Sequence, residues 1–131
     1  AAFDFRGRRL LLAEDNEINR EVAEGILREV GFALESAADG QLALSAYLSH
    51  PAGYYDAILM DVRMPVMDGL TATRRIRGSG KEDAATVPIL AMTANAFEED
   101  IKKSLAAGMD AHLAKPIEPE ILYRRLRQYI K

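Results

Sequence analysis

Five side chains that could together carry phosphoryl chemistry stand where short apolar runs of the sequence end. They are Glu14, Asp15, Asp61, Thr93 and Lys115. Clustered carboxylates repel one another, so the pKa of each would rise unless a cation neutralised the group. Oxygen ligands with room for water suit Mg²⁺ or Mn²⁺ rather than Zn²⁺, and the lysine would add a second positive charge. Such a pocket suits phosphoryl transfer, in which a carboxylate accepts the group as an acyl phosphate.

The stretch around Asp61 organises the predicted fold. Residues 58–60 form an apolar run without polar alternation, which is typical of a strand buried on both faces. The run ends in Asp61, and Pro65 followed by Asp68-Gly69 marks a loop and the start of a helix. Open α/β sheets bind ligands at the carboxyl ends of their strands, so Asp61 is the candidate reactive group. Taken alone, the same pattern also fits a solvated aspartate at a strand end.

The rest of the chain alternates strand and helix patterns. Apolar runs predict strands at 9–13, 33–37, 55–60, 87–92 and 111–114. Between and after these strands, apolar residues recur at helical spacing, which predicts five helices. The residues predicted to form their buried faces are, helix by helix, Ile18, Val22, Ala23, Ile26, Leu27 and Val30; Leu42, Ala43, Ala46 and Tyr47; Leu70, Thr73 and Ile76; Ile101, Leu105 and Ala106; and Ile121, Leu122, Leu126 and Ile130. This alternation predicts βαβ units and a parallel sheet covered on both faces. The carboxyl ends of all strands then share one edge, where the five reactive side chains converge.

The composition is that of one ordinary globular domain spanning 1–131. The chain has 131 residues, of which 49% are hydrophobic and 28% charged. A net charge of −3 does not favour nucleic acid as a partner, and the absence of cysteine excludes disulfides and thiolate zinc sites. No apolar run approaches the ~20 residues that cross a bilayer, so we expect no membrane contact. The start lacks an initiator Met and a signal-peptide pattern, so we expect a segment of a longer protein, with 1–7 a linker remnant and 8–130 the domain.

Four segments resemble a known family. They read Leu-Leu-Ala-Glu-Asp-Asn-Glu-Ile-Asn from Leu11, Met-Asp-Val-Arg-Met-Pro-Val-Met-Asp-Gly from Met60, Ala-Met-Thr-Ala-Asn-Ala from Ala91 and Gly-Met-Asp-Ala-His-Leu-Ala-Lys-Pro-Ile from Gly108. Together they resemble the response-regulator receiver domain of two-component phosphorelays, most of all the receivers of hybrid sensor histidine kinases. The resemblance covers residues 8–130. It implies a single three-layer (βα)5 domain of the α/β class, flavodoxin-like, whose parallel five-stranded sheet has the order 2-1-3-4-5.

The resemblance also implies roles for the reactive residues. Asp61 matches the phosphoacceptor, which takes a phosphoryl group from a partner phosphohistidine in a Mg²⁺-dependent reaction. The implied metal ligands are Asp15, Asp61, the backbone carbonyl of Arg63 and, through water, Glu14. The implied phosphoryl-binding and switch residues are Thr93, Ala94 and Lys115. The bond between Lys115 and Pro116 is expected to be cis, which is otherwise a minority form.

Further positions concern signalling and turnover. The family often has Tyr or Phe at its switch position on the fifth strand, but this chain has His112, which we expect to be a partly exposed side chain rather than a metal ligand. Arg63 and Asn95 would flank the water that hydrolyses the aspartyl phosphate, and we predict that they gate it. Three apolar residues near the site are candidates for partner contact, namely Ile18, Pro116 and Ile117.

The resemblance implies partners and a compartment. The partners would be the phosphohistidine domain of a histidine kinase, a histidine phosphotransfer domain, or both, and the location would be cytoplasmic, as a free protein or as part of a membrane-anchored sensor kinase. Whether the parent chain is itself a kinase stays open.

Two other classes of function are weighed against the receiver. A metal-dependent phosphohydrolase with an aspartyl nucleophile remains the alternative, although such enzymes want an acid two residues after the nucleophile, where this chain has Arg63. A flavin-binding module would need a phosphate loop where Glu14-Asp15-Asn16 stands, and those carboxylates would repel a phosphate in the absence of a metal.

Overall fold

Five parallel strands alternate with five helices in the computed structural model, which describes residues 3–94 and 98–130. The strands are β1 (Arg9–Ala13), β2 (Ala33–Ala37), β3 (Ala57–Asp61), β4 (Ile89–Thr93) and β5 (Ala111–Ala114). The helices are α1 (Glu17–Glu29), α2 (Gly40–Leu48), α3 (Gly69–Arg77), α4 (Glu98–Ala107) and α5 (Pro119–Tyr129). The sheet order is β2-β1-β3-β4-β5, and every neighbouring pair is parallel. The predicted fold class and strand order are confirmed.

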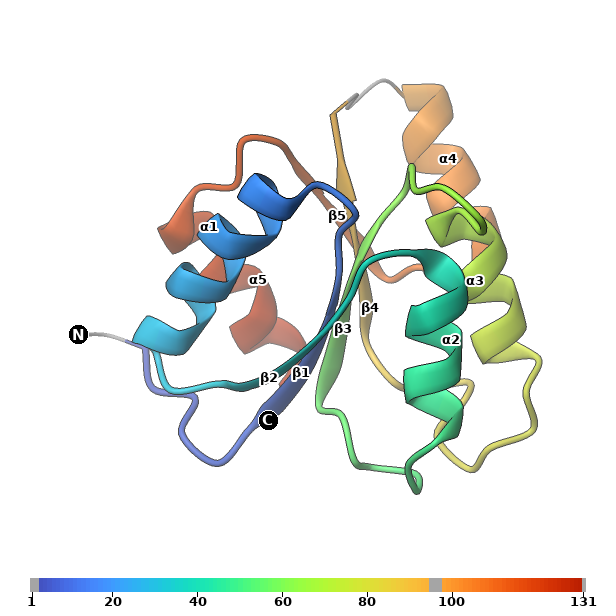
Figure 1. The fold of residues 1–131 in the computed structure, drawn as a ribbon, viewed down its shortest axis with the longest axis horizontal. Coiled ribbons are helices and arrows are strands. Elements are labelled where there is room, and N and C mark those ends of the chain that lie inside the picture. Colours follow the sequence, from blue (N-terminus) through green and yellow to red (C-terminus); the bar gives the residue numbers. More distant parts are fainter. Residues whose placement is uncertain (1–2, 95–97, 131) are drawn as a thin grey trace.

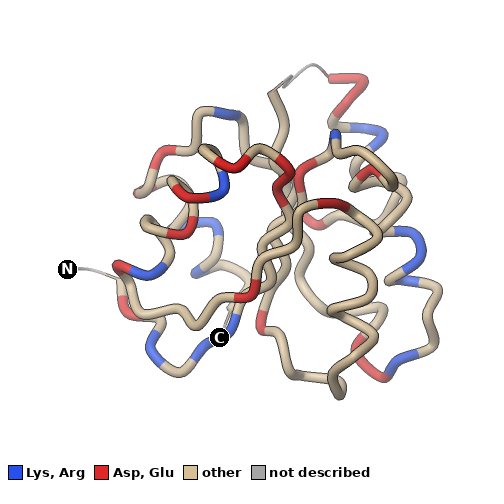
Figure 2. Tube along the Cα trace, in the orientation of Figure 1, with Lys and Arg blue, Asp and Glu red and all other residues tan. Residues whose placement is uncertain are grey.

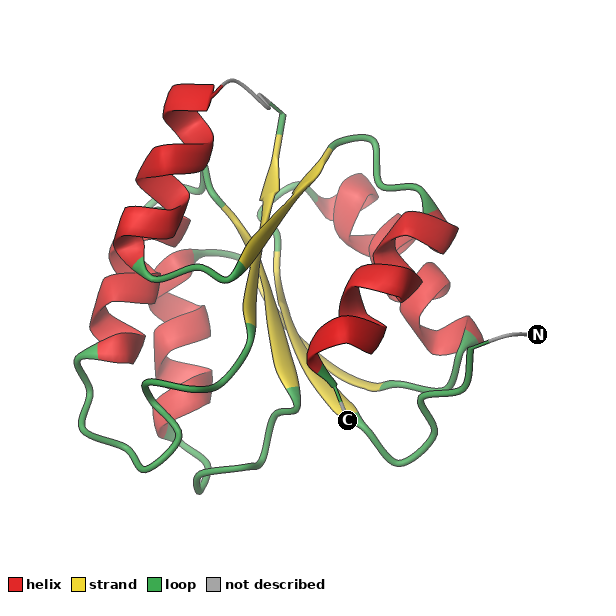
Figure 3. Ribbon diagram, turned by 180° about the vertical axis from the view of Figure 1, so that it is seen from behind, coloured by secondary structure: helices red, strands yellow, loops and turns green. Residues whose placement is uncertain are grey.

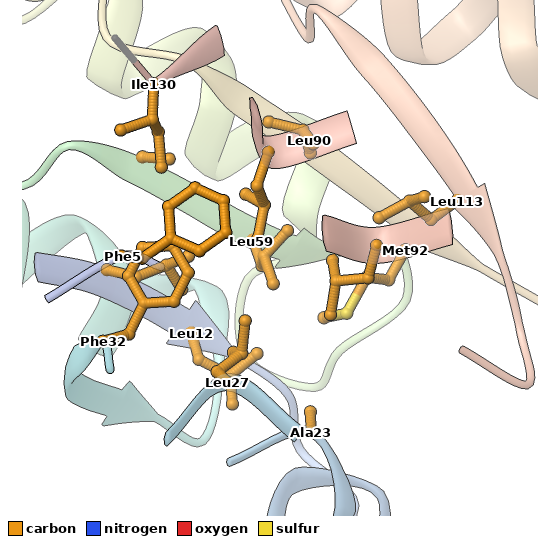
Figure 4. Packing of buried hydrophobic residues seen from close by; sticks show 14 of the residues in the cluster. Phe5, Leu12, Ala23, Leu27, Phe32, Leu59, Leu90, Met92, Leu113 and Ile130 are labelled. Carbon is orange, nitrogen blue, oxygen red and sulfur yellow. The ribbon is translucent and has the colours of Figure 1, made fainter. Parts of the chain in front are cut away.

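The sheet is the middle of three layers. Helices α1 and α5 cover one face and α2, α3 and α4 cover the other, as the front and rear views show (Figures 1 and 3). Each face has its own apolar core, and the side chains of β3 and β4 alternate between the two. Leu59 and Leu90 join the α1/α5 core shown in Figure 4, whereas Ile58 and Ile89 join the core on the opposite face.

Burial of the central strands fixes the position of the reactive edge. Every residue of β3 and β4 is buried, including the terminal Asp61 and Thr93. Fully burying one Leu or Ile side chain contributes about 1.5–3 kcal/mol, so a one-residue slip of either strand would be costly. The register of the sheet therefore fixes the positions of the residues at the ends of these strands.

Side-chain caps start the three helices that follow β1, β2 and β3. The side chains of Asn16, Asp39 and Asp68 accept hydrogen bonds from the backbone N–H groups of Asn19, Leu42 and Thr71. Each cap satisfies an N–H group that the first helical turn leaves without a partner, which is worth ~1 kcal/mol. The helix start predicted at Asp68-Gly69 is confirmed.

Two predicted strand boundaries are wrong by one or two residues. The third strand begins at Ala57 rather than at residue 55 and includes Asp61. The fourth begins at Ile89 rather than at residue 87 and includes Thr93. Pro88 explains the second difference, because proline has no N–H group to donate to the ladder. The two reactive residues therefore belong to the strands themselves.

Four of the five predicted helix faces are also wrong in part, because these members of them are exposed: Ile18, Val22, Leu42, Leu105, Ala106 and Ile121. Helix α2 is apolar almost all round, so its periodicity does not select a face, and Leu44 is buried instead of Leu42. Helix α4 turns its small residues Ser104 and Ala107 inward, which lets its backbone lie close to its neighbours.

The N-terminal residues pack onto the domain. Phe5, which lies within the predicted linker remnant, is only 3% exposed and stacks on Phe32 with ring centroids 4.6 Å apart. Its backbone N–H also donates to the Val30 carbonyl at 2.7 Å. Phe5 is therefore a core residue of the domain, which corrects its assignment to a linker.

Candidate functional site

The five reactive side chains predicted from the sequence come together at the carboxyl edge of the sheet. They line one cavity of about 250 Å³, whose walls are Glu14, Asp15, Asn16, Asn19, Asp61, Val62, Arg63, Thr93, Ala94 and Lys115. Acidic residues gather at this end of the sheet, near the start of α1 (Figure 2). Asn95, a predicted gating residue, lies outside the described residues.

Three carboxylates form a compact cluster in this cavity. Glu14, Asp15 and Asp61 each offer one oxygen, and these oxygens lie within 4.8 Å of one another. Glu14 is 2% exposed and Asp61 is 5% exposed, whereas Asp15 is exposed. Hard oxygen donors with one open side fit Mg²⁺, which keeps several waters and takes few protein ligands. Asp15 and Asp61 would hold the ion, with the Arg63 carbonyl as the third protein ligand.

Lys115 partly neutralises the cluster. Its ammonium donates to Glu14 Oε1 at 2.7 Å and to Asp61 Oδ2 at 3.0 Å. Burial alone would lower the pKa of Lys115, but the hydrogen bonds to Glu14 and Asp61 outweigh burial and raise that pKa above its ordinary value. The lysine stays charged, and among the described residues it is the cationic side chain that hydrogen-bonds to these carboxylates. The local deficit of positive charge is what a divalent cation would correct.

The end of β5 fixes Lys115 from the backbone. Its N–H group donates to the Thr93 carbonyl at 2.8 Å, which ties the end of β5 to the end of β4. The Lys115–Pro116 bond is cis, as predicted. Because Thr93 pairs with Ala114 and Lys115 directly follows Ala114, both Thr93 and Lys115 line the same cavity.

The loop between β3 and α3 is fixed at both ends. Gly69 donates its N–H to the Val62 carbonyl at 2.9 Å, and a Cβ at this glycine would lie 2.0 Å from the Asp61 carbonyl oxygen. Only glycine therefore closes this loop over the end of β3. At the reactive residue, the Arg63 N–H donates to Asp61 Oδ1 at 3.3 Å. Asp61 is thus held through both carboxylate oxygens, by Arg63 on one and Lys115 on the other.

Two of the three predicted partner residues, Pro116 and Ile117, line a second hollow next to the first. This apolar groove of about 490 Å³ is lined by Glu14, Asn19, Val22, Ala23, Met92, Lys115, Pro116 and Ile117. It lies between α1 and the loop after β5, and it shares Glu14, Asn19 and Lys115 with the reactive cavity. Ile18 is 72% exposed and Pro116 is exposed, whereas Ile117 is half-buried against the core.

Sequence reasoning missed three residues at this edge. Asn16 caps α1, Asn19 lines both hollows, and Arg20 donates from Nη1 to the Glu14 carbonyl at 2.9 Å. The Asn16 cap could have been found, because Asn immediately before a helical apolar pattern is a start signal. His112 is partly exposed, as expected, and it borders a different hollow, beside α5.

The comparisons with known proteins agree with this geometry. The family described as "Response regulator receiver domain" matches residues 10–127. The chain is 38% identical over 124 residues to "Hybrid signal transduction histidine kinase I" of Dictyostelium discoideum, covering 93% of this chain but 7% of that protein. The chain thus spans only a small part of this relative, and a similarly small part of the plant histidine kinases that it also matches.

Two solved structures have the same fold. The receiver domain of sensor histidine kinase PA1611 from Pseudomonas aeruginosa, with a magnesium ion coordinated in its active site cleft, superposes with a TM-score of 0.85 at 44% identity, covering 94% of this chain and 97% of that one. The receiver domain of Ssk1 from Saccharomyces cerevisiae, crystallised with the histidine phosphotransfer protein Ypd1, gives 0.83 at 29% identity, with 95% and 90% covered.

The fold and site define a three-layer α/β domain with a cluster of three carboxylates at the carboxyl ends of its parallel strands. The chain belongs to the response regulator receiver domain family, and it is a receiver domain of two-component systems. Within the described part of the chain, none of the helices has the length and apolarity that a membrane crossing requires.

Proposed function

We propose that Asp61 is the phosphoacceptor of this receiver. The observation that carries the proposal is the state of its carboxylate: it is 5% exposed, ends the central strand and borders a cavity that it shares with Glu14, Asp15 and Lys115. Its oxygens are aimed by the Lys115 ammonium and the Arg63 N–H group. A carboxylate held in this way is already placed for attack on a phosphorus atom that enters the cavity.

The reaction exchanges one bond to phosphorus for another. An Asp61 oxygen attacks the phosphorus of a partner's phosphohistidine, the O–P bond forms, and the N–P bond breaks. The imidazole nitrogen keeps the electron pair of that bond and takes up a proton. Lys115 balances negative charge on the acceptor, and Thr93, which lines the same cavity, would donate a hydrogen bond from its hydroxyl to a phosphoryl oxygen. A bound Mg²⁺, or Mn²⁺, would neutralise the phosphoryl oxygens.

The apolar groove beside α1 is the proposed docking surface. The donor must bring a histidine side chain to Asp61, so it must cover the surface that adjoins the reactive cavity. The groove adjoins it through Glu14, Asn19 and Lys115 and is lined by the exposed Pro116, and the exposed Ile18 directly precedes Asn19 on α1. We infer that the partner is the phosphohistidine domain of a histidine kinase, a histidine phosphotransfer domain, or both, and that the exchange takes place in the cytoplasm.

Beryllofluoride tests the acceptor assignment without turnover. Added with Mg²⁺, it mimics a phosphoryl group on a carboxylate, so the amide signals of Asp61, Thr93 and Lys115 should shift, and EDTA should reverse the shifts. Shifts confined to other regions would reject Asp61. Steady hydrolysis of small phosphate esters would instead favour the phosphohydrolase, which the position of Arg63 disfavours.

The docking proposal needs a separate test. Ile18→Asp places a charge on the proposed apolar contact and should slow transfer from a phosphorylated histidine phosphotransfer domain while leaving phosphorylation by acetyl phosphate unchanged. Leu42→Asp is the matched control, because Leu42 is also an exposed apolar residue on a helix but lies on α2. Equal slowing of transfer in both variants would place the contact elsewhere.

A further inference from the structure

Arg20 holds the peptide that carries the two adjacent carboxylates. Its guanidinium Nη1 donates to the Glu14 carbonyl at 2.9 Å, and that carbonyl belongs to the peptide bond between Glu14 and Asp15. Arg20 is itself anchored in α1, because its backbone N–H donates to the Asn16 carbonyl at 2.9 Å. The contact therefore closes a short ring between the end of β1 and the second turn of the helix.

Hydrogen bonds hold Glu14 through its backbone and its side chain, but none is made by the Asp15 carboxylate within the described residues. The Glu14 N–H donates to the Ala37 carbonyl at 3.0 Å, and the Glu14 carboxylate accepts from Lys115 and from the Asn16 N–H. The Asp15 carboxylate accepts no hydrogen bond from any residue in the described ranges 3–94 and 98–130. The direction of the Asp15 side chain is consequently set by the orientation of its own backbone, which begins at the peptide that Arg20 holds.

We propose that Arg20 is a positioning residue of the metal site. By fixing the plane of the Glu14–Asp15 peptide, it directs the Asp15 carboxylate toward Asp61. A ligand displaced by a few tenths of an ångström matters at this site, because Mg²⁺ tolerates little departure from octahedral geometry. Partners that orient metal ligands typically change metal affinity by ~10–100-fold when they are removed. The inference rests on the proposed function, since it assumes that Asp15 binds the ion.

A purely electrostatic role for Arg20 predicts the opposite sign. A guanidinium near the carboxylates repels a divalent cation, so its removal would strengthen Mg²⁺ binding if charge were its only contribution. A positioning role predicts weaker binding, because the gain in attraction would be outweighed by the misplaced ligand. The direction of the change in Mg²⁺ affinity therefore distinguishes the two roles.

The test compares the Mg²⁺ dissociation constants of the parent, Arg20→Ala and Arg28→Ala. The free energy of unfolding of each protein is also measured, in the absence of metal. Arg28 is the matched control, since it lies on the same helix, in the last turn, and is exposed. We expect binding about tenfold weaker in Arg20→Ala and within about twofold of the parent in Arg28→Ala. Added guanidinium ion, at concentrations too low to unfold the protein, should restore part of the affinity of Arg20→Ala, whereas ammonium ion should not.

Three results would overturn the inference: unchanged affinity in Arg20→Ala, stronger binding in Arg20→Ala, or equal weakening in both variants. If Arg20→Ala does not fold, Arg20→Lys replaces it, because lysine keeps the charge without the planar donor geometry and should also bind Mg²⁺ more weakly. An Arg20→Lys affinity equal to that of the parent would then overturn the inference. Failure of the parent to bind Mg²⁺ at all would contradict the proposed function instead.

Discussion

The amino ends of the strands form one edge of the sheet, the amino edge, and their carboxyl ends form the opposite, carboxyl edge. Each edge carries a cluster that contains aspartate and lysine, and the clusters differ in how completely protein groups match their charges. At the amino edge, Asp83 accepts hydrogen bonds from the Tyr47 hydroxyl at 2.6 Å and the Gly53 N–H at 2.9 Å. Lys81 donates to the carbonyl oxygens of Tyr47 and His50, and its ammonium lies 3.9 Å from the centroid of the Tyr47 ring. Both charges are satisfied by protein groups.

At the carboxyl edge the matching is incomplete. Lys115 donates hydrogen bonds to two buried carboxylates, while Asp15 is exposed and adds a third negative charge to the cavity. The amino-edge cluster joins the loop before β3 to the loop before β4, so it stabilises the fold. The carboxyl-edge cluster leaves negative charge and space for a cation and a phosphoryl group. Unmatched charge at a fixed position, rather than charge alone, distinguishes the reactive edge.

The largest effect should follow removal of the unmatched charge. Asp15→Asn keeps the shape of the side chain but removes the charge of a metal ligand, so Mg²⁺ should bind at least about tenfold more weakly. Because a ligand that binds only the folded state stabilises it, saturating Mg²⁺ should raise the unfolding temperature of the parent much more than that of the variant. Calorimetry with and without Mg²⁺ measures both quantities. An equal thermal shift in the two proteins would place the ion elsewhere.

Removal of Asp83, whose charge is matched by protein groups, should lower the stability of the fold instead. Asp83→Ala leaves the Tyr47 hydroxyl and the Gly53 N–H without their acceptor, and it should cost about 2 kcal/mol of unfolding free energy with no change in Mg²⁺ affinity. Burial alone would raise the pKa of Asp83, but hydrogen bonds from Tyr47 and Gly53 and the charge of Lys81 lower it below the ordinary 3.8.

A lowered pKa gives this effect a defined pH window. The stabilisation from ionised Asp83 is fully present above about pH 4 and is lost as the pH falls through the lowered pKa. The difference in stability between the parent and Asp83→Ala should therefore be constant near neutral pH and should narrow in acid. Urea unfolding between pH 7 and pH 3 measures it. A difference that grew in acid would contradict the direction of the shift.

Lys115 at the carboxyl edge and Lys81 at the amino edge form a matched pair of substitution sites that tests the same difference between the edges. Lys115→Ala should slow phosphorylation by acetyl phosphate about tenfold, because the acceptor loses its neutralising cation. Lys81→Ala should leave that rate unchanged and cost about 1–2 kcal/mol of stability. Rates from intact mass spectrometry and stabilities from urea unfolding give both effects. Similar rates in the two variants would show that the edges do not differ as described.

The smallest predicted effect concerns Arg63. Its backbone is fixed by the N–H contact to Asp61, and its exposed side chain lies at the rim of the cavity. A guanidinium there can hydrogen-bond a phosphoryl oxygen or crowd the water that attacks it. Arg63→Ala should therefore speed the decay of phosphorylated Asp61 a few-fold at fixed Mg²⁺. Unchanged decay would make the arginine a bystander, and slower decay would show that it assists hydrolysis.

The reactive edge was predictable from the sequence because it follows from topology. In a chain that alternates strands and helices, the carboxyl ends of β1, β3, β4 and β5 lie at one edge of the sheet. The residues at those ends can be read directly from the sequence. The pattern could not predict which face of an apolar or small-residue helix is buried. Leu42 and Leu105 are exposed because neighbouring helices, which periodicity does not describe, select the packed face.

Contacts between a side chain and a distant backbone group were also beyond the sequence. Arg20 holding the Glu14 carbonyl, and Asp83 joining two loops, depend on how the loops close, and neither residue belongs to a periodic pattern. The amino-edge cluster consequently gave no signal in the sequence, although it contains the same residue types as the reactive edge. Residue type predicts chemistry here only when topology also predicts position.

Covalent labelling of Asp61 tests the central claim most directly. The parent is incubated with acetyl phosphate and Mg²⁺, and its intact mass and the modified residue are determined beside Asp61→Asn, whose folding is checked by its NMR spectrum. We predict that the parent gains one phosphoryl group, on Asp61, that EDTA prevents the gain, and that Asp61→Asn gains none while keeping its fold. Phosphorylation of Asp61→Asn at the yield of the parent, or of another residue in the parent, would contradict the account.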